Sequence, residues 1–290
     1  MEISENQTPL VSIIIPCFNR EQYISDAIDS CLRQSYKNIE IIVVDDGSTD
    51  DSVRFIKTKY QNSLKLIVQK NKGSASARNT GLYACRGQFI IFLDSDDWMS
   101  DDLVEAHINT LKKWPSVDIC CADSVAVRND GSMSKIHKSP WPAIPSNPIS
   151  FFLLKPPPFP ACEIYRKSTL LIHGGFDENM KAFTDSGLRL KIVLAGGLVV
   201  RTENGYAVYR PVENSITRNN LNIHYHAIKL VKILSSTEYV KDPKINTLLQ
   251  ERLIAHRLRY WNSWFRYHFS LRPISIIKFL RQLMRVTTVD

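Results

Sequence analysis

Four short apolar runs, each followed by a stretch of helical periodicity, organise the first part of the chain. The runs are Val11–Pro16, Ile39–Val44, Leu64–Val68 and Phe89–Leu93. Continuous apolar runs of this length are typical of strands that a parallel sheet buries on both faces. Since consecutive parallel strands are joined through right-handed crossovers, the alternation predicts an α/β fold with a mostly parallel sheet flanked by helices.

Acidic residues follow two of these runs where each predicted strand ends. Asp45–Asp46 follow the second run, and Asp94 and Asp96 follow the fourth. Carboxyl ends of parallel strands share one edge of a sheet, where open α/β folds bind ligands. Asp94 and Asp96 would point to the same side, and a divalent cation held by carboxylates and substrate phosphates would neutralise their charge. The alternative is a solvated helix start, with Asp97 or Ser100 as the N-cap.

The composition is that of an ordinary soluble globular protein, with 44% apolar and 23% charged residues. The six cysteines form no CxxC pair, and the neighbours Cys120 and Cys121 would face opposite sides of a strand. We therefore expect neither a zinc site nor a disulfide framework, and a reduced, cytoplasmic setting. No secretory signal and no run long enough to span a membrane is recognisable in the sequence.

The net charge of +8 is concentrated in the C-terminal part of the chain. Residues 216–290 hold 13 Lys or Arg against 4 Asp or Glu, whereas residues 1–215 hold 24 against 25. We predict one domain over 1–215 and a basic amphipathic helical extension over 216–290. The extension suits an anionic membrane surface. Packing on the first domain or formation of a homodimer is the alternative, and nucleic acid is less favoured because no recognition fold is present. The predicted apolar stripes of the extension are Leu253, Ile254, Leu258, Trp261 and Phe265, and Ile276, Ile277, Leu280, Leu283 and Met284.

Beyond residue 115 the pattern is looser. Val117–Ala122 and Ser124–Val127 are predicted as two strands, and Asn129–Gly131 as a turn. Eight prolines fall within residues 139–160, which predicts a loop with little regular structure. A later helix is predicted to end at Gly196–Gly197.

The glycine-containing segment Gly73–Gly81 is a poor match to known phosphate-binding loops. It lacks the lysine and the spacing of a P-loop, and the chain holds no GxGxxG fingerprint. Phosphate binding would therefore depend on a metal ion and on Arg78. The alternative for Arg78 is a solvated or salt-bridged residue of a helix.

Five motifs, in order along the chain, resemble the motif set of family 2 glycosyltransferases of the GT-A fold. They are Val11–Asn19 (VSIIIPCFN), Ile41–Asp50 (IIVVDDGSTD), Asn71–Leu82 (NKGSASARNTGL), Phe92–Trp98 (FLDSDDW) and Gly174–Glu178 (GGFDE). The resemblance implies a nucleotide-sugar-binding half over about 1–100 and an acceptor half over 101–215. It also implies sugar transfer from a nucleoside-diphosphate donor, with inversion at the anomeric carbon and a bound Mn²⁺ or Mg²⁺.

The same resemblance implies roles for individual residues. Pro16 and Phe18 would line the base pocket, and Asp46 would accept a hydrogen bond from the nucleobase, most naturally the uracil of a UDP-sugar. Arg78 would approach the base or the diphosphate, and Asp94 would lie near the ribose and the metal. The predicted nucleotide-sugar-binding residues are Pro16, Phe18, Asp45, Asp46, Arg78, Asp94 and Ser95, and the predicted metal ligands, a DXD pair, are Asp94 and Asp96.

Direct displacement of the diphosphate needs a base for the acceptor hydroxyl on the opposite face of the sugar. Residues 184–196 resemble the family's EDxxLxxRLxxxG frame, with Thr184 in place of Glu and Lys191 in place of Arg. Asp185 keeps the family position and is the predicted general base, for which a helix N-cap is the alternative. If the two replacements impair turnover, the chain would instead be a nucleotide-sugar-binding scaffold.

The segment Gln282–Val286 (QLMRV) resembles the QxxRW motif of processive polysaccharide synthases but lacks its tryptophan. Since no membrane span is recognisable either, addition of a single sugar is the better prediction. The acceptor would be a glycan or a lipid-linked saccharide of polysaccharide biosynthesis. We expect the protein in the cytoplasm, as a peripheral protein of the inner membrane face if the extension attaches there.

Overall fold

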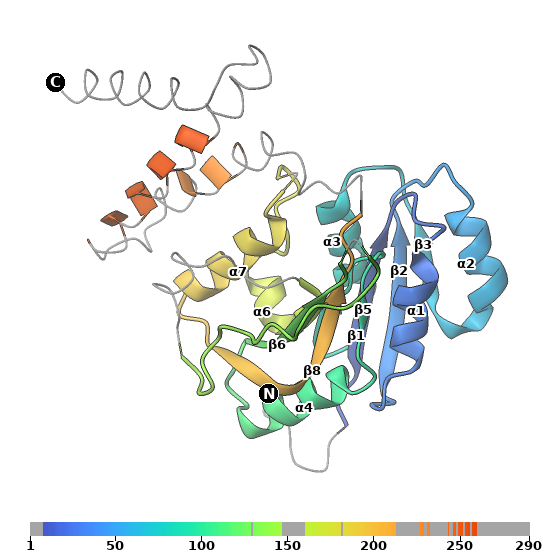
Figure 1. Cartoon of the computed structure of the whole chain (residues 1–290), viewed down its shortest axis with the longest axis horizontal. Helices are drawn as coiled ribbons and strands as arrows, with labels where there is room; N and C mark the ends of the chain where they lie inside the picture. The colour runs from blue at the N-terminus through green and yellow to red at the C-terminus, as the bar shows by residue number, and fades with distance from the viewer. Residues whose placement is uncertain are drawn as a thin grey trace. The chain divides into compact units, whose positions relative to one another are not determined.

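The structure is a computed structural model that describes residues 8–128, 130–146, 160–180 and 182–212, together with individual helical positions between 225 and 259. The chain divides into two units, Met1–Val212 and Glu213–Asp290. All strands described here belong to the first unit (Figure 1). The finer division of that unit into donor and acceptor halves at about residue 100 stays a prediction.

Within the described residues, the first unit alternates strands and helices as far as β4, which is followed directly by the short strand β5. The strands are β1 (Val11–Cys17), β2 (Ile39–Asp45), β3 (Lys65–Val68), β4 (Phe89–Phe92), β5 (Trp98–Met99), β6 (Ile119–Ala126), β7 (Glu163–Arg166) and β8 (Val199–Tyr209). The α-helices are α1 (Ile24–Leu32), α2 (Ser52–Tyr60), α3 (Ser74–Ala84), α4 (Leu103–Lys113), α6 (Lys167–Ile172) and α7 (Thr184–Leu194). Short 3-10 helices are η1 (Gln61–Ser63) and η2 (Pro160–Cys162). The predicted strand–helix alternation is confirmed, with element ends shifted by a few residues.

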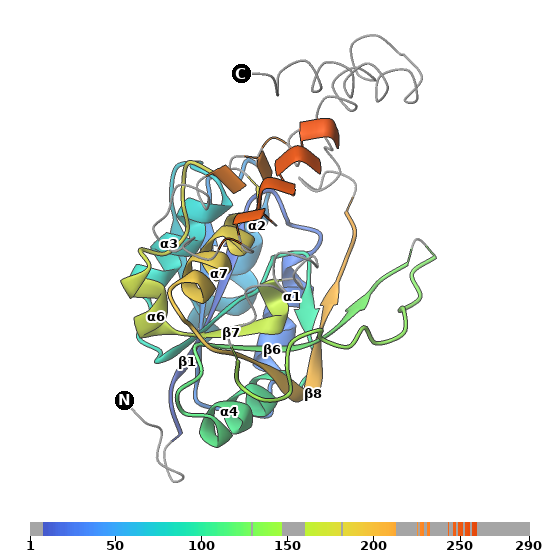
Figure 2. The same cartoon turned by 90° about the vertical axis from the view of Figure 1, so that its left-hand side faces the viewer.

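The strands form one sheet in the order β3-β2-β1-β4-β7-β6-β8-β5. The first four in this order run parallel to one another. β7 pairs antiparallel with both β4 and β6, so it joins the parallel half to the strands of the later sequence. Figure 2 shows α3 and α6 on one side of the parallel strands and α1 on the other. The predicted α/β fold, with helices flanking a mostly parallel sheet, is confirmed.

Residues 117–127 hold one strand where two were predicted. β6 runs without a break from Ile119 to Ala126 and pairs parallel with β8. The pairing shifts register between Cys121 and Asp123. Because such an irregularity shifts the pairing without ending the strand, the polar Asp123 interrupts the apolar pattern while the strand continues.

A glycine brings α3 close to β1. A β-carbon at Gly81 would lie 2.4 Å from Cγ2 of Ile14, a fully buried residue of β1. A larger side chain would push the helix away from the strand. This close approach holds α3 against the sheet, and with it Arg78, which lies about one turn earlier in the same helix.

The acidic groups that follow β2 and β4 lie at the same edge of the sheet. β1 lies between these strands, and the ladder continues past their ends. Asp46 N donates to Cys17 O at 2.8 Å, and Leu93 N donates to Ile14 O at 3.0 Å. The three strands are parallel, so their carboxyl ends meet at one edge, as the sequence pattern predicts.

The helix after β4 begins later than Asp97 or Ser100. α4 starts at Leu103, after the short strand β5, which pairs with β8. Ser100 Oγ donates to Asp102 Oδ1 at 2.6 Å, and Asp97 accepts a hydrogen bond from Arg210 N at 2.9 Å. The alternative that Asp97 or Ser100 caps the helix is therefore wrong.

Several sequence-based expectations concern the remaining parts of the chain. The six cysteines are all buried and none forms a disulfide. The described positions between 225 and 259 are helical, as the periodicity predicts, and Leu253 is buried. Residues 147–159 of the proline-rich segment, Asn129 of the predicted turn and the stripe beyond residue 260 lie outside the described residues. No helix in the described part of the chain is long and apolar enough to cross a membrane.

Candidate active site

At the end of β2, Asp45 is engaged by the turn that follows it. Its carboxylate accepts hydrogen bonds from the backbone N–H groups of Gly47 and Ser48, at 3.1 and 2.9 Å, and from the Ser48 hydroxyl. Gly47 has a φ of 79°, a left-handed conformation that favours glycine. Asp45 is fully buried, so its charge is compensated by these local donors.

Asp46 holds the loop that leads into α3. Its Oδ1 accepts hydrogen bonds from Gln69 Nε2 at 2.7 Å and Lys72 N at 2.9 Å, and its Oδ2 accepts one from Gly73 N at 2.7 Å. The residue is 3% exposed. Hydrogen bonds to a charged acceptor are each worth about 1.5–3 kcal/mol. Asp46 therefore shapes the chain at the place where the resemblance puts the nucleobase.

Arg78 joins the end of β4 to the start of α7. Its Nη2 donates to Asp94 Oδ1 at 2.6 Å, and its Nη1 donates to Thr184 Oγ1 at 3.2 Å. The side chain is buried, with the guanidinium carbon 5.5 Å from the centroid of the Phe176 ring. Burial disfavours the charge of Arg78, but Asp94 and Asp185 outweigh that effect and raise its pKa. Of the two alternatives for a helical arginine, Arg78 is salt-bridged.

The GGFDE segment is tied to α3 through Asn79. Asn79 Nδ2 donates to Phe176 O and to Glu178 Oε1, both at 2.9 Å, and Phe176 N donates to Asn79 Oδ1 at 2.9 Å. Gly175 has a φ of 67°, and a β-carbon there would lie 2.6 Å from Asn79 Oδ1. Phe176 packs edge-on against Phe92 of β4, with ring centroids 4.8 Å apart. These contacts hold the Phe176 ring in place, and the guanidinium of Arg78 lies over that ring.

The carboxyl groups after β4 are crowded. Asp96 Oδ2 lies 3.3 Å from Arg20 Nε, and its side chain is 14% exposed. Burial and the neighbouring Asp94 raise the pKa of Asp96 against the opposing effect of Arg20. Burial and Asp94 also raise the pKa of Asp97 well above its usual range. Asp94, Asp96 and Asp97 thus lie close together with Arg78, Arg20 and Arg210 as positive neighbours, and a cation beside them would further relieve their mutual repulsion.

Asp94 and Asp96 suit a hard divalent cation such as Mn²⁺ or Mg²⁺. Both offer carboxylate oxygens, and the Asp94 side chain is 33% exposed at the edge of the sheet. Within the described residues, no group of three or more His, Cys, Asp or Glu side chains could hold a metal ion. A cation here would therefore have two carboxylates and take its other ligands from water and donor phosphates, the usual arrangement for Mg²⁺.

Asp185 lies in the first turn of α7. Phe183 precedes the helix with a φ of 58°, and no side chain caps its N-terminus, so the N-cap alternative for Asp185 is wrong. Asp185 Oδ2 accepts a hydrogen bond from Arg189 Nη2 at 2.6 Å. The Asp185 side chain is 23% exposed, whereas Arg189 is fully buried and its Nε lies 3.0 Å from Glu163 Oε2 of β7.

The other predicted binding residues lie at the ends of β1 and β4. Pro16 is buried within β1, and Phe18, just past the end of that strand, is 42% exposed. Ser95 is buried between Asp94 and Asp96. The predicted site residues therefore surround one edge of the sheet, and Arg78 joins that edge to the helix of Asp185.

Sequence reasoning missed Arg20, Glu163 and Arg189. Arg189 follows Asp185 by four residues, a spacing that places both on one face of a helix and could have indicated the pair. Glu163 stands in the apolar segment ACEIY, which could have indicated a buried charge in need of a partner. Arg20 carries no signal that separates it from a surface arginine.

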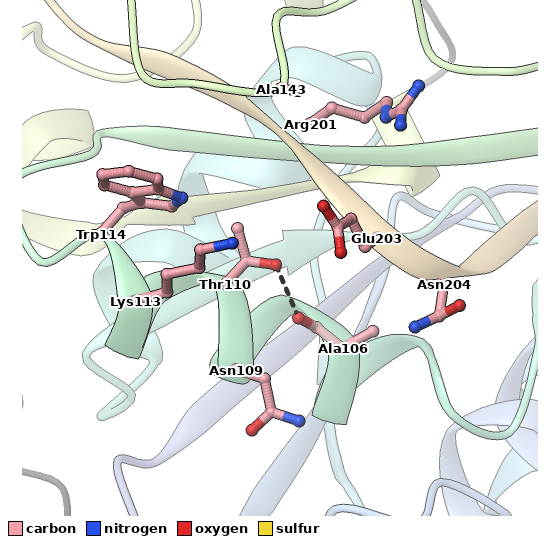
Figure 3. A pocket seen from close by; sticks show the side chains of 9 residues that line it. All are labelled: Ala106, Asn109, Thr110, Lys113, Trp114, Ala143, Arg201, Glu203 and Asn204. Carbon is pink, nitrogen blue, oxygen red and sulfur yellow. Dashed lines mark hydrogen bonds between the residues drawn. The ribbon is translucent and has the colours of Figure 1, made fainter.

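The hollow drawn in Figure 3 lies away from these residues. It opens between α4 and β8, and none of the predicted site residues lines it. Its lining consists of Ala106, Asn109, Thr110, Lys113, Trp114, Ala143, Arg201, Glu203 and Asn204. The predicted site residues therefore lie at the carboxyl edge of the parallel strands and not in this hollow.

The fold is that of GT-A-like glycosyltransferases. The chain is similar to residues 1–349 of S. aureus TarS in the crystal structure with UDP-GlcNAc, with a TM-score of 0.68 and 21% identity over 87% of this chain and 79% of that chain. It is also similar to the mannosyltransferase PcManGT from Pyrobaculum calidifontis in complex with GDP-Man and Mn²⁺, with a TM-score of 0.62 and 17% identity over 96% of this chain and 81% of that chain. At these identities the likeness establishes the fold alone.

Residues 12–170 match the model of Glycosyl transferase family 2, and the chain belongs to this family. It is 31% identical to chondroitin synthase of Escherichia coli over 195 residues, which are 66% of this chain and 27% of that protein. It is 44% identical to glycosyltransferase GlyA of Streptococcus pneumoniae over 129 residues, 44% of this chain and 18% of that protein. The chain spans less than half the length of these curated relatives.

Proposed function

We propose that this glycosyltransferase moves a single sugar, with inversion, from a nucleoside-diphosphate sugar to a hydroxyl of a glycan or lipid-linked saccharide. The observation that supports this most is the connection Asp94–Arg78–Thr184. It joins the acidic edge, where a donor and its cation would bind, to the helix that carries Asp185. The nucleotide sugars bound by TarS and PcManGT agree with such a donor.

In this reaction Asp185 takes the proton of the acceptor hydroxyl while the hydroxyl oxygen bonds to the anomeric carbon. The bond between that carbon and the diphosphate oxygen breaks, and its electron pair leaves with the diphosphate. A bound Mn²⁺ or Mg²⁺ supplies Lewis-acid stabilisation of the leaving group. Asp94 and Asp96 would hold the cation, and Arg78 adds a positive charge beside the diphosphate.

The donor is most naturally UDP-linked. The exposed ring of Phe18 provides an apolar surface for a base at the end of β1. Asp46 accepts three hydrogen bonds from the chain, and a carboxylate has about four acceptor positions, so one remains for the imide N–H of uracil. A preference for a guanine nucleotide would contradict this assignment.

The test is a panel of UDP-GlcNAc, UDP-GalNAc, UDP-Glc and GDP-Man with Mn²⁺, followed by release of the nucleoside diphosphate with water as acceptor. We expect metal-dependent release from a UDP-sugar. Asp185→Asn should lower the rate about 10²–10⁴-fold, because a general base contributes that much, and leave donor affinity by calorimetry within twofold.

Asp101→Asn is the matched control, since Asp101 is 61% exposed in an ion pair with Arg33. Its rate should equal that of the unmodified protein. If the protein binds a donor but releases no nucleoside diphosphate with any divalent metal ion, the result would support the nucleotide-sugar-binding scaffold instead. Release that is unchanged in Asp185→Asn would remove Asp185 from the mechanism.

We further propose that the second unit attaches to an anionic membrane surface on the cytoplasmic side. Its basic excess supports this, and Arg257 and Arg259 are exposed on helical positions. The full chain should sediment with phosphatidylglycerol vesicles and not with phosphatidylcholine vesicles. A double change of both arginines to Glu should weaken binding at least about tenfold, because each basic residue near such a surface contributes about 1 kcal/mol. A dimeric protein that sediments with neither kind of vesicle would favour the homodimer alternative.

A further inference from the structure

Behind Asp185 lies a buried ion pair that has no direct part in the proposed chemistry. Arg189 Nη2 donates to Asp185 Oδ2 at 2.6 Å, and Arg189 Nε lies 3.0 Å from Glu163 Oε2. The Tyr165 hydroxyl donates to the same oxygen of Glu163. The side chains of Arg189 and Glu163 are 0% exposed, whereas that of Asp185 is 23% exposed. Asp185 is therefore the solvent-facing end of a buried row of charged groups.

A buried pair of this kind is a poor means of stabilising a core. The cost of removing both charges from water offsets their attraction, and apolar side chains of similar volume often stabilise a fold as well or better. The surroundings offer such packing, since Tyr165 contacts Phe92 edge-on at a centroid distance of 6.1 Å. The pair is better explained by the position that it imposes on Asp185.

Arg189 constrains the direction of the Asp185 carboxylate. The two residues lie one turn apart on α7, and Glu163 and Tyr165 point to the same side of β7. The Arg189 guanidinium donates a hydrogen bond from Nη2 to Asp185 Oδ2, while its Nε lies in an ion pair with Glu163 Oε2, so the charge of Glu163 holds the guanidinium between the two carboxylates. Within the described part of the chain, no hydrogen bond to Asp185 Oδ1 is made, and this oxygen is left for the acceptor.

We propose that Glu163 and Arg189 are positioning residues of the transfer reaction: Glu163 holds the Arg189 guanidinium, which holds one oxygen of Asp185 and leaves the other to the acceptor hydroxyl. The proposal rests on the proposed role of Asp185 as general base. Glu163 also shares the positive charge of Arg189. Without that negative charge, Asp185 would be the nearest counter-charge of Arg189 and would be drawn towards it, away from the acceptor.

The protonation state of Glu163 links this arrangement to pH. Burial raises the pKa of Glu163 to about 7, although Arg189 and the Tyr165 hydroxyl lower it, and Asp185 raises it further. Among the described residues, the other titratable groups beside it are the thiols of Cys121 in β6 and Cys162 in η2, whose pKa values burial raises, so both stay neutral. The rate of the unmodified protein is expected to fall as the pH decreases through about 7.

The test is Glu163→Gln, which keeps the shape of the side chain and an oxygen that accepts from the Tyr165 hydroxyl but removes the charge that faces Arg189. The readout is Mn²⁺-dependent diphosphate release from the UDP-sugar selected by the donor panel. We expect kcat to fall about 10- to 100-fold, since a small displacement of a catalytic group costs up to that much, with the donor KM within twofold. The decrease in rate near pH 7 should be absent from the variant. Arg189→Lys should lower kcat similarly.

Thr202→Val is the matched control, because it removes another buried hydrogen bond, between His107 Nδ1 and Thr202 Oγ1 at 2.7 Å. Its kcat should stay unchanged. Unchanged kcat in Glu163→Gln and Arg189→Lys, with Asp185→Asn inactive, would overturn this inference and leave the proposed function intact. If Glu163→Gln does not fold, the pH profile of the unmodified protein is the test. A rate of diphosphate release that is constant between pH 6 and 8 would overturn the inference. Absence of release from the unmodified protein with every donor would instead contradict the proposed function.

Discussion

The ends of β2 and β4 carry similar acidic sequences but hold their charges in different ways. After β2, Asp45 and Asp46 receive hydrogen bonds mostly from backbone N–H groups of the adjoining turn and loop. After β4, Asp94 and Asp96 are paired with arginines of other elements, Arg78 and Arg20. The carboxylates after β2 are compensated mainly by backbone dipoles, and those after β4 by the charges of arginine side chains.

The difference is that the pair after β2 organises the local chain, whereas the pair after β4 is held by long-range ion pairs. A carboxylate that accepts mainly from backbone donors holds a loop in place, as Asp46 does for the entry to α3. Burial and the neighbouring Asp94 raise the pKa of Asp96, and in the proposed function a cation relieves this repulsion. In the proposed function, the acids after β4 hold the cation, whereas those after β2 shape the loop and the base pocket.

The largest expected effect is on activity at the β4 end. Asp96→Asn should lower metal-dependent diphosphate release by about 10²–10³-fold, since a bound cation contributes several kcal/mol to stabilisation of the leaving group. The midpoint of urea unfolding should stay equal or rise, because the change removes repulsion from Asp94. A lower midpoint with an unchanged rate would mean that the β4 acids are structural, and would break the comparison.

The next effect is on stability at the β2 end. Asp46→Asn places an amide where three N–H groups converge, so it should lower the free energy of unfolding by about 2–3 kcal/mol in urea titration. Donor affinity should also fall, because the loop before α3 loses its anchor. Equal unfolding midpoints for Asp46→Asn and Asp96→Asn would contradict the division of roles.

The free energy of unfolding should depend on pH in opposite ways through Glu163, beside β4, and Asp50, beyond β2. Burial raises the pKa of Glu163, in the strand next to β4, to about 7. Beyond β2, burial disfavours the charge of Asp50, but hydrogen bonds from Ser52 outweigh it and lower the Asp50 pKa. The Glu163 carboxyl binds its proton at a higher pH in the folded state than in the unfolded state. The free energy of unfolding should therefore rise by about 1 kcal/mol as the pH falls from 8 to 6. The stability that Asp50 contributes should be lost only below about pH 4.

Urea titrations at pH 8, 6 and 3.5 measure both effects. Glu163→Gln should remove the gain between pH 8 and 6 and leave the acid loss in place. A gain that persists in this variant would assign the titration to another group, such as the acids after β4.

The smallest effect is expected within the turn after β2. Ser48→Ala removes the hydroxyl that donates to Asp45 and accepts from Asn19 N at 2.9 Å. The cost should be about 1 kcal/mol of unfolding free energy, since the backbone donors to Asp45 remain. The rate of diphosphate release should change less than twofold. A loss of activity comparable to that of Asp96→Asn would place this turn in the catalytic machinery.

Much of the parallel half could be predicted from the sequence, because its signals are local. The apolar runs, the glycine at position 47 and the helix that ends before Gly196 each depend on a few neighbouring residues. The mixed half was less predictable. Only long-range pairing decides that β7 enters between β4 and β6, and that the polar Asp123 lies within a single strand.

The sequence by itself determined the order of strands and helices, the family and the positions of the acidic residues, since short-range periodicity and motif spacing carry this information. Only the tertiary structure decided which charges meet. Arg78 reaches Thr184 across 106 residues, Arg20 reaches Asp96 across 76, and Arg189 is buried against Glu163. No local pattern separates a buried arginine from a solvated one, because burial depends on what the rest of the chain packs against it.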